Sequence, residues 1–142
     1  MSRIPLESAS RIIAGAMAKG RELGLKPLSI AVLDAGGHLI SFARADGASN
    51  MRAQIAIGKA GGALALGVSS RVVGTMAAER PTFVASLASL APQGIVPAAG
   101  GVIVVDETGH PIGAVGVTGD SSDNDEIAAL AGIEAAGLSA QR

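Results

Sequence analysis

The chain has 142 residues, with 11 Lys and Arg against 12 Asp and Glu, a formal net charge of −1 and no cysteine. This length fits one domain, so we expect residues 1–142 to fold as a single domain. The balanced charge argues against nucleic acid and anionic membranes as partners. The lack of cysteine excludes disulfides, thiol catalysis and Cys-ligated zinc. There is no long apolar run and an acid comes early at Glu7, so we expect a cytoplasmic protein without a membrane span.

The apolar residues of this chain are small. Hydrophobic residues make up 49% of the sequence, yet only two are aromatic, and 20 residues are glycine. Small side chains allow close packing, but each buries little area. We therefore expect the protein to gain from burying further surface between subunits and to form a homo-oligomer.

The first half of the chain predicts a helix followed by a β-hairpin. Apolar residues recur at three- and four-residue steps from Leu6 to Leu23, and Gly24 provides a stop. Residues Leu28–Leu33 are β-branched in part and alternate in character, which indicates a strand. A turn at Asp34–Gly37 then leads into a second strand, His38–Arg44.

The second half predicts a helical pair, another hairpin and a last helix. Residues Asn50–Val68 have helical spacing, although Gly58 and Gly61–Gly62 weaken a helix and are tolerated where a backbone or a flat ligand comes close. The remaining predicted elements are helices from Ser69 or Ser70 to about Ala78 and from Pro81 to Leu90, strands Gly101–Asp106 and His110–Thr118, and a helix from Ser122 or Asp123 to about Ala136. The order α-ββ-αα-ββ-α predicts an antiparallel sheet with helices packed on it, an α+β fold. The two hairpins show no convincing sequence repeat.

The first candidate site lies on or beside the first hairpin. Asp34 and His38 are four residues apart, and Arg44 and Asp46 follow. A histidine beside a carboxylate is a usable acid–base pair or a haem ligand. The alternative is that His38 is a solvated turn residue and Asp34 a turn former.

The second candidate site lies on the glycine-rich helix. Arg52 and Lys59 are seven residues apart, two turns along one stripe, and can clamp a carboxylate or a propionate. The neighbouring glycines, Gly62 among them, leave space for a ligand. The alternative is the polar face of an ordinary amphipathic helix.

The third candidate, the acidic segment after Gly119, is better explained by helix capping than by ligand binding. Asp120, Asp123, Asp125 and Glu126 surround a helix start, where acids stabilise the helix and would repel a phosphate. His110 precedes a proline in the second hairpin turn, and we expect it to be exposed.

Several motifs in the chain resemble the GlcG/HbpS family of small haem-binding and haem-degrading proteins. They are Ala31–Ile40 with Arg44–Ala48, Ile57–Ala60, Pro97–Val102 with Ile112–Asp120, and Asp123–Glu126 with Ala131–Leu138. The resemblance covers nearly the whole chain in the right order. It implies a profilin-like α+β fold with a central antiparallel sheet, assembly into homo-oligomers, and binding or degradation of haem or a related tetrapyrrole.

Two positions depart from the family pattern. Lys59-Ala60 is followed by Gly61-Gly62 where many members have a threonine, and Ile103 stands where many have proline. The first departure removes a hydroxyl from the site that the family implies. Phe42 and Phe83 are the only aromatic residues that can stack on a flat ligand.

Two function hypotheses follow. The first is binding of haem or a similar flat, anionic cofactor near a subunit interface, with His38 as axial ligand, Arg52 or Lys59 pairing with propionates, and Arg44, Gly62 and Phe83 as further ligand contacts. The second is a cofactor-independent enzyme, a lyase or hydrolase acting on a small aromatic or carboxylate metabolite, with His38 or Asp46 as proton carrier and Arg52 or Lys59 holding the carboxylate. A regulatory oligomer without pocket chemistry is a third option. The first two hypotheses require His38 and the cations of the middle helix to face one hollow.

Overall fold

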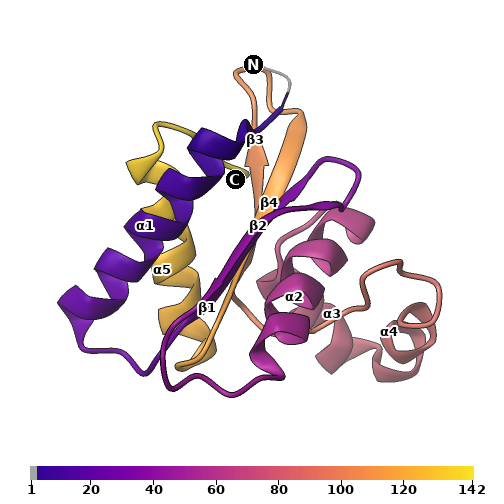
Figure 1. The fold of residues 1–142 in the computed structure, drawn as a ribbon. Helices are drawn as coiled ribbons and strands as arrows, with labels where there is room; N and C mark the ends of the chain where they lie inside the picture. The colour runs from indigo at the N-terminus through magenta and orange to yellow at the C-terminus, as the bar shows by residue number, and fades with distance from the viewer. Residues whose placement is uncertain (1–2) are drawn as a thin grey trace.

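A computed structural model describes residues 3–142 of the chain (Figure 1). The elements in order are α1 (Leu6–Leu23), β1 (Ser29–Asp34), β2 (Leu39–Arg44), α2 (Arg52–Leu66), α3 (Ser70–Glu79), α4 (Pro81–Leu87), β3 (Gly101–Val105), β4 (Pro111–Thr118), α5 (Ser122–Ala135) and β5 (Ser139–Ala140). All strand pairs are antiparallel, and the strands lie in the order β2-β1-β4-β3-β5. This is the α+β order predicted from the sequence, with one short strand added.

The element boundaries differ from the predicted ones mainly at helix ends. Helix α1 has the predicted limits and ends at Gly24, whose φ of 66° is left-handed. Helix α2 is shorter than predicted, and α4 stops at Leu87, after which a turn rather than helix continues to Leu90. Strand β5 has two residues, too few to give a periodic signal.

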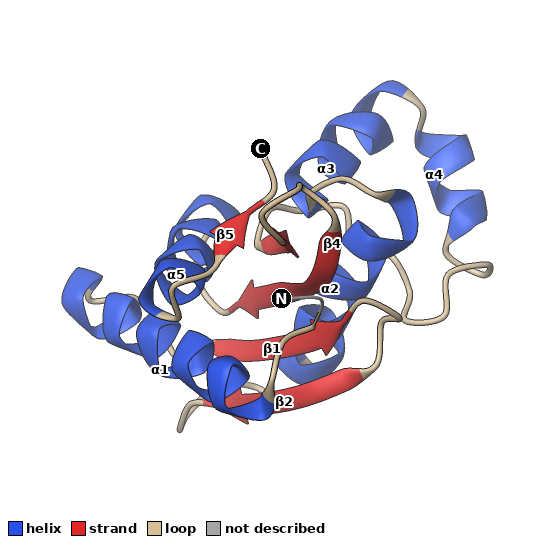
Figure 2. Ribbon diagram, turned by 90° about the horizontal axis from the view of Figure 1, so that it is seen from above, coloured by secondary structure: helices blue, strands red, loops and turns tan. Residues whose placement is uncertain are grey.

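Helices cover both faces of the sheet. Helices α1 and α5 pack side by side on one face, α2 packs on the other face, and α3 and α4 extend beyond α2 (Figures 1 and 2). The main core lies under α1 and α5, with Ile12, Ile30 and Val115 fully buried there, and a smaller cluster including Leu33 and Ala60 lies under α2. No helix among residues 3–142 is long and apolar enough to cross a membrane.

Glycines explain how a chain with small side chains packs so closely. A Cβ at Gly15 would lie 2.6 Å from Ala135 Cβ, where α1 crosses α5. A Cβ at Gly116 would overlap the carbonyl oxygen of Ala56, where α2 lies on the sheet. The high glycine content therefore places helix backbones against each other and against the sheet.

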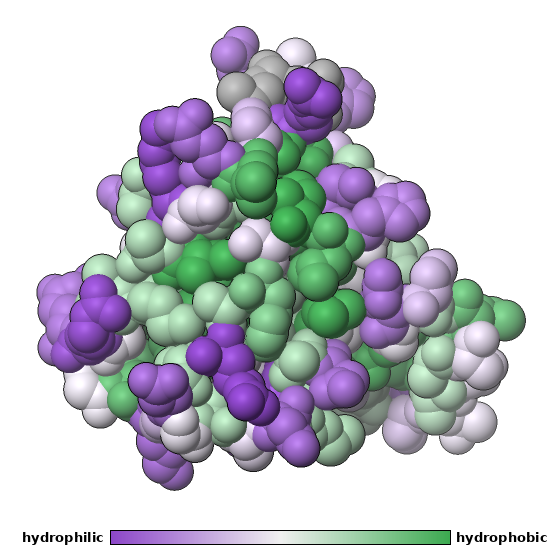
Figure 3. All heavy atoms as spheres, viewed as in Figure 1, coloured by the Kyte–Doolittle hydropathy of each residue, from purple (hydrophilic) through white to green (hydrophobic). Residues whose placement is uncertain are grey.

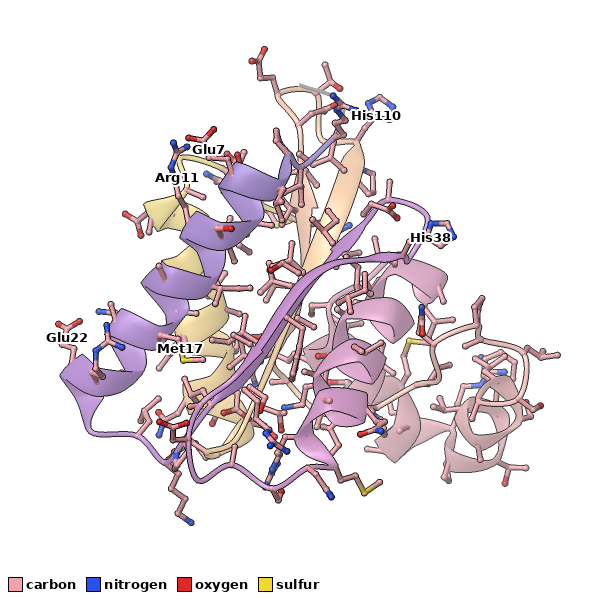
Figure 4. All side chains as sticks on the ribbon, in the orientation of Figure 1. Glu7, Arg11, Met17, Glu22, His38 and His110 are labelled. Carbon is pink, nitrogen blue, oxygen red and sulfur yellow. The ribbon has the colours of Figure 1, made fainter. Side chains whose placement is uncertain are left out.

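The turns of the two hairpins share one design, Asp-x-x-Gly-His. In both, the aspartate Oδ1 accepts from the histidine backbone N–H, at 2.9 Å in Asp34–His38 and 3.0 Å in Asp106–His110. In both, the fourth residue is a glycine with φ near 86°, 85° at Gly37 and 87° at Gly109. The structure thus shows a local repeat that the sequence analysis did not recognise, and both turns lie at the same end of the sheet (Figure 4).

Candidate functional site

The predicted site residues fall into two groups at opposite ends of the sheet. His38 follows the Asp34 end of β1. Arg44 pairs with Ser29, at the other end of the same strand. Six residues of strand β1 separate these ends, which at about 3.3 Å per residue is roughly 17 Å.

Arg52 belongs to the Ser29 end. Its Nη1 donates to Thr118 Oγ1 at 2.8 Å, and Thr118 pairs directly with Ser29. The prediction that His38 and the cations of α2 share one hollow is therefore wrong for a single chain. Helix α2 runs along the sheet, so its first turn lies at the Ser29 end, where Arg52 contacts Thr118, and its last turns lie beside the β1–β2 turn at the other end.

An apolar groove lies beside the His38 end. It consists of two adjoining cavities of about 180 and 390 Å³ that share Ala65 and Pro92. The first is bounded by the β1–β2 turn, the last turns of α2 and Gln93, and the second by α4 and the segment after it. The lining residues that carry apolar surface include Leu64, Leu66, Leu87, Leu90 and Ile95. Together the cavities reach the range of about 300–1,000 Å³ typical of ligand sites.

His38 lies at the edge of this groove. A Cβ at Gly36, which lines the groove, would lie 3.0 Å from two atoms of the imidazole. The ring itself is exposed, with 80% of its side-chain surface accessible, and it extends away from the turn in Figure 4. The amide of Gln93 donates to the carbonyl oxygen of Gly37 at 2.9 Å and ties this turn to the opposite wall of the groove.

Asp34 orients the imidazole of His38. Its Oδ1 accepts from the backbone N–H of His38 and of Gly36, and these hydrogen bonds hold the pKa of Asp34 below its ordinary value. The same oxygen lies 3.3 Å from His38 Nδ1. An ionised carboxylate at this place favours the tautomer with the proton on Nδ1, which leaves the lone pair of Nε2 free to bind a metal.

Phe83 lies on α4, toward the outer end of the groove. It precedes the groove residue Leu87 by one helical turn, and 40% of its surface is exposed. The guanidinium of Arg80 lies 4.1 Å from the centre of its ring. Phe83 was predicted from the sequence and Arg80 was not, although the two are only three residues apart, a spacing at which side chains of a helix meet.

The glycines of α2 mainly allow the segment after α4 to pack closely against this helix. A Cβ at Gly58 would lie 2.7 Å from Val96, one at Gly61 would lie 2.5 Å from Gln93 Cβ, and one at Gly62 would lie 3.2 Å from Ile95 Cα. Of the two readings offered by the sequence, a close backbone or a flat ligand, the structure supports the close backbone at Gly62. Gly61 also lines the groove.

Lys59 is buried in an internal ion pair and does not face a hollow. Only 3% of its side chain is exposed, and its Nζ lies 3.1 Å from Asp125 Oδ2 and 3.0 Å from the carbonyl oxygen of Val117. Burial lowers the pKa of Lys59 and raises that of Asp125. The predicted role of Lys59 as a ligand clamp is corrected, since its charge is already used to join α2 to α5. Its partner could not be identified from the sequence, because 66 residues separate the two.

The start of α5 is capped as predicted. Ser121 Oγ accepts from the backbone N–H of Asn124. Asp120 accepts from the side chain of Asn124 and from the backbone N–H of Lys26 and Ser121, and these hydrogen bonds lower its pKa to about 2. The acidic segment thus caps α5 and connects it to the backbone at Lys26, and it is not a ligand site.

The last predicted site residue, Asp46, is exposed on the loop between β2 and α2. It lies at the opposite end of β2 from His38, so the two cannot serve one reaction within a single chain. Among residues 3–142 no cluster of three or more metal-binding side chains is present.

Known proteins support the same architecture. The fold is similar to a crystal structure of a double mutant of Streptomyces reticuli HbpS, with 28% identity, a TM-score of 0.80, and coverage of 94% of this chain and 87% of that one. It is also similar to Klebsiella pneumoniae protein ORFY, with 25% identity, a TM-score of 0.85, and coverage of 96% and 92%. A PduOC:heme complex has the same fold at 19% identity, with a TM-score of 0.86 and coverage of 99% of both chains.

Sequence comparison gives the family directly. No curated protein matches the chain. The family model described as haem-degrading protein, HbpS-like, matches residues 4–134, which is most of the sequence. The chain therefore belongs to the HbpS-like family of haem-degrading proteins.

Proposed function

We propose that the protein binds haem, or a closely related flat tetrapyrrole, in the apolar groove, with His38 Nε2 as the iron ligand. The observation that carries the proposal is the Asp34–His38 pair at the edge of the groove. Membership of the HbpS-like family supports haem as the ligand. A bound haem would supply redox-active iron.

The residues around the groove fit the chemistry of this ligand. The leucines and Ile95 present an apolar surface to a porphyrin face. Phe83 at the outer end offers an aromatic surface, and the guanidinium of Arg80 above it can pair with a propionate. Asp34 holds the imidazole in the tautomer that binds iron. This arrangement replaces the predicted propionate partners, because Arg52 lies at the other end of the sheet and Lys59 is buried in its ion pair with Asp125.

Titration with haemin tests the role of His38. Haemin added to the wild-type protein should give a saturable Soret shift. We expect His38→Ala to abolish the band of histidine-ligated iron and to weaken binding at least tenfold, because loss of an axial ligand costs more than about 1.4 kcal/mol.

His110→Ala is the matched control. His110 has the same exposure and sits in the same kind of turn, 4.0 Å from Asp106, but away from the groove. This variant should bind haemin as the wild-type protein does. If both variants keep the wild-type spectrum, or if His110→Ala alone loses it, the proposed site is wrong.

A further inference from the structure

We propose that the protein has a second and separate binding site, for a small oxyanion such as a carboxylate or phosphate. It consists of Ser29, Arg44, Arg52 and Thr118, and is called the oxyanion site below. It lies at the end of the sheet opposite His38. The inference does not depend on haem binding, because the apolar groove shares no residue with it.

The first observation is a buried hydroxyl without a partner. Ser29 is 0% exposed. Its Oγ is the only buried side-chain polar atom among residues 3–142 that makes no hydrogen bond. Buried polar groups are nearly always paired, because leaving one unpaired costs free energy. A ligand oxygen that accepts a hydrogen bond from Ser29 Oγ would supply the missing partner.

Strand geometry shows on which face this hydroxyl lies. Side chains two residues apart on a strand share a face. Leu33, four residues after Ser29, packs against Ala60 of α2. Ser29 therefore faces α2 as well. Its cross-strand neighbour Thr118 accepts a hydrogen bond from Arg52 in the first turn of α2, which confirms the direction.

The second observation is an excess of positive charge around the hydroxyl. Ser29 lies between Arg44 and Thr118 in register, so the Arg44 side chain starts from the same face of the sheet. Arg52 uses Nη1 for Thr118. Neither arginine has a carboxylate partner among the ion pairs of residues 3–142.

The nearby acids are already engaged. Asp125 pairs with Lys59, and Asp120 accepts from the backbone of Lys26 and from Asn124. The N-terminus of α2 adds to the positive potential, because no side chain caps it and its first turn contains no acid. The remaining carboxylate, Asp46, is exposed on the loop that leads to α2.

These groups select a small anion that approaches from solvent. The planar guanidinium of Arg52 is suited to donate to two oxygens of a carboxylate or phosphate. The Ser29 hydroxyl would donate to one of these two oxygens or, in a phosphate, to a third oxygen. Arg44 is exposed and Arg52 is half-buried, so an anion from solvent would meet these two side chains first. Ser29 and Thr118 are buried, so the arginine side chains would have to shift for an anion to reach the Ser29 hydroxyl.

Titration of the full-length protein with benzoate and, separately, with inorganic phosphate tests the site by amide chemical shifts. We expect saturable shifts centred on residues 29, 44, 52–54 and 118, and the tighter of the two probes identifies the preferred anion. Arg52→Gln should weaken that binding at least tenfold, since it removes a charge-assisted hydrogen bond worth about 1.4 kcal/mol or more. Arg21→Gln, which removes an exposed arginine at the end of α1, is the control and should bind as the wild-type protein does.

Ser29→Ala separates a binding role from a structural one. The hydroxyl has no partner in the structure, so its removal should leave the thermal midpoint of the free protein unchanged or raise it. The same variant should weaken binding of the probe about tenfold. The proposal is overturned if neither anion gives saturable shifts, if Arg52→Gln binds like wild type, or if Ser29→Ala leaves the affinity unchanged. None of these results bears on haem binding at His38.

Discussion

His38 and His110 differ in what surrounds their imidazole rings. Both are exposed, and both follow an aspartate by four residues in the same kind of turn. His110 Nδ1 contacts Thr108 Oγ1 at 2.6 Å, whereas His38 Nδ1 faces only the carboxylate of Asp34 at 3.3 Å. The turn of His38 borders the apolar groove beside α2 and α4, whereas the turn of His110 borders a separate cavity that Asp106 and Gly109 line together with C-terminal residues. The exposure expected for His110 is confirmed, and the residue identities alone could not have separated the two histidines.

A prediction at the residue scale concerns stability in acid. Hydrogen bonds from Asn124, Lys26 and Ser121 lower the pKa of Asp120 to about 2, from an ordinary value of 3.8. Asp120 therefore takes up its proton at a lower pH in the folded state than in the unfolded state. The stabilisation is complete above pH 3.8 and is lost as the pH falls toward about 2.

Asp120→Asn should accordingly lower the thermal midpoint at pH 7 and make it less dependent on pH between 4 and 2. Thermal scans followed by circular dichroism measure both effects. Asp46→Asn is the control, since this carboxylate is exposed on a loop and makes no hydrogen bond among the contacts of residues 3–142. If the thermal midpoint of Asp120→Asn depends on pH as that of the wild-type protein does, the hydrogen bonds of Asp120 do not contribute to the acid sensitivity.

At the scale of elements, α2 contributes to the internal ion pair and to both proposed sites. Its first turn supplies Arg52, its middle supplies Lys59 to the ion pair with Asp125, and its last turns form one wall of the groove. The helical spacing of this segment could be predicted from the sequence. The partners could not, because Thr118 and Asp125 belong to elements that only the fold brings close.

We expect loss of Lys59 alone to destabilise the protein more than loss of both Lys59 and Asp125. Removing one charge from a buried pair leaves the other uncompensated, so Lys59→Met should cost about 3–5 kcal/mol in the free energy of unfolding. Adding Asp125→Leu to this variant should recover a large part of the loss. Urea unfolding measures both.

Lys19→Met is the control for this prediction. Lys19 pairs with Glu22 on the surface of α1, so its loss should change stability by less than about 1 kcal/mol. A Lys59→Met variant that is no less stable than Lys19→Met would mean that the internal ion pair does not hold α2 to α5.

The glycines of α2 give a prediction in which packing opposes helix propensity. Replacing Gly61 by alanine should stabilise an isolated helix by about 1 kcal/mol. In this protein the new methyl group would lie 2.5 Å from Gln93 Cβ. We therefore expect Gly61→Ala to lower the urea midpoint of unfolding and to displace the segment that forms the groove wall. A higher midpoint would show that the segment can move aside without cost.

At the scale of the whole molecule, the architecture was largely predictable and the position of the site was not. Hydrophobic periodicity and turn residues identified all elements except β5, and the motifs pointed to the family that the comparisons confirm. Distances between elements depend on strand register, which places His38 and Arg52 at opposite ends of β1. Periodicity along the chain carries no such information.

Assembly into homo-oligomers remains a prediction, and the edge of the sheet supports it. Strand β2 pairs only with β1, so its other edge is free among the described strands. Apolar side chains gather over the middle of the face drawn in Figure 3. Strand β2 itself contains the half-buried Ile40 and Phe42 and the exposed Leu39. A second copy of the chain can pair with a free, apolar edge.

Light scattering coupled to size exclusion should therefore give a mass that is a multiple of the monomer mass. Leu39→Lys places a charge at the edge and should shift the mass toward the monomer. Leu23→Lys changes a similarly exposed leucine at the end of α1 and should not. A wild-type protein that is monomeric at high micromolar concentration contradicts this assembly.

A tetrapyrrole in the apolar groove with its metal on His38, as we propose, would place its ring current directly over the imidazole. The chain contains only two histidines, so the imidazole protons of the protein with zinc protoporphyrin bound can be followed by NMR and assigned with His110→Ala. We expect large upfield ring-current shifts for His38 and none for His110. Unshifted His38 signals under saturating zinc protoporphyrin, or shifts at His110 instead, would contradict it.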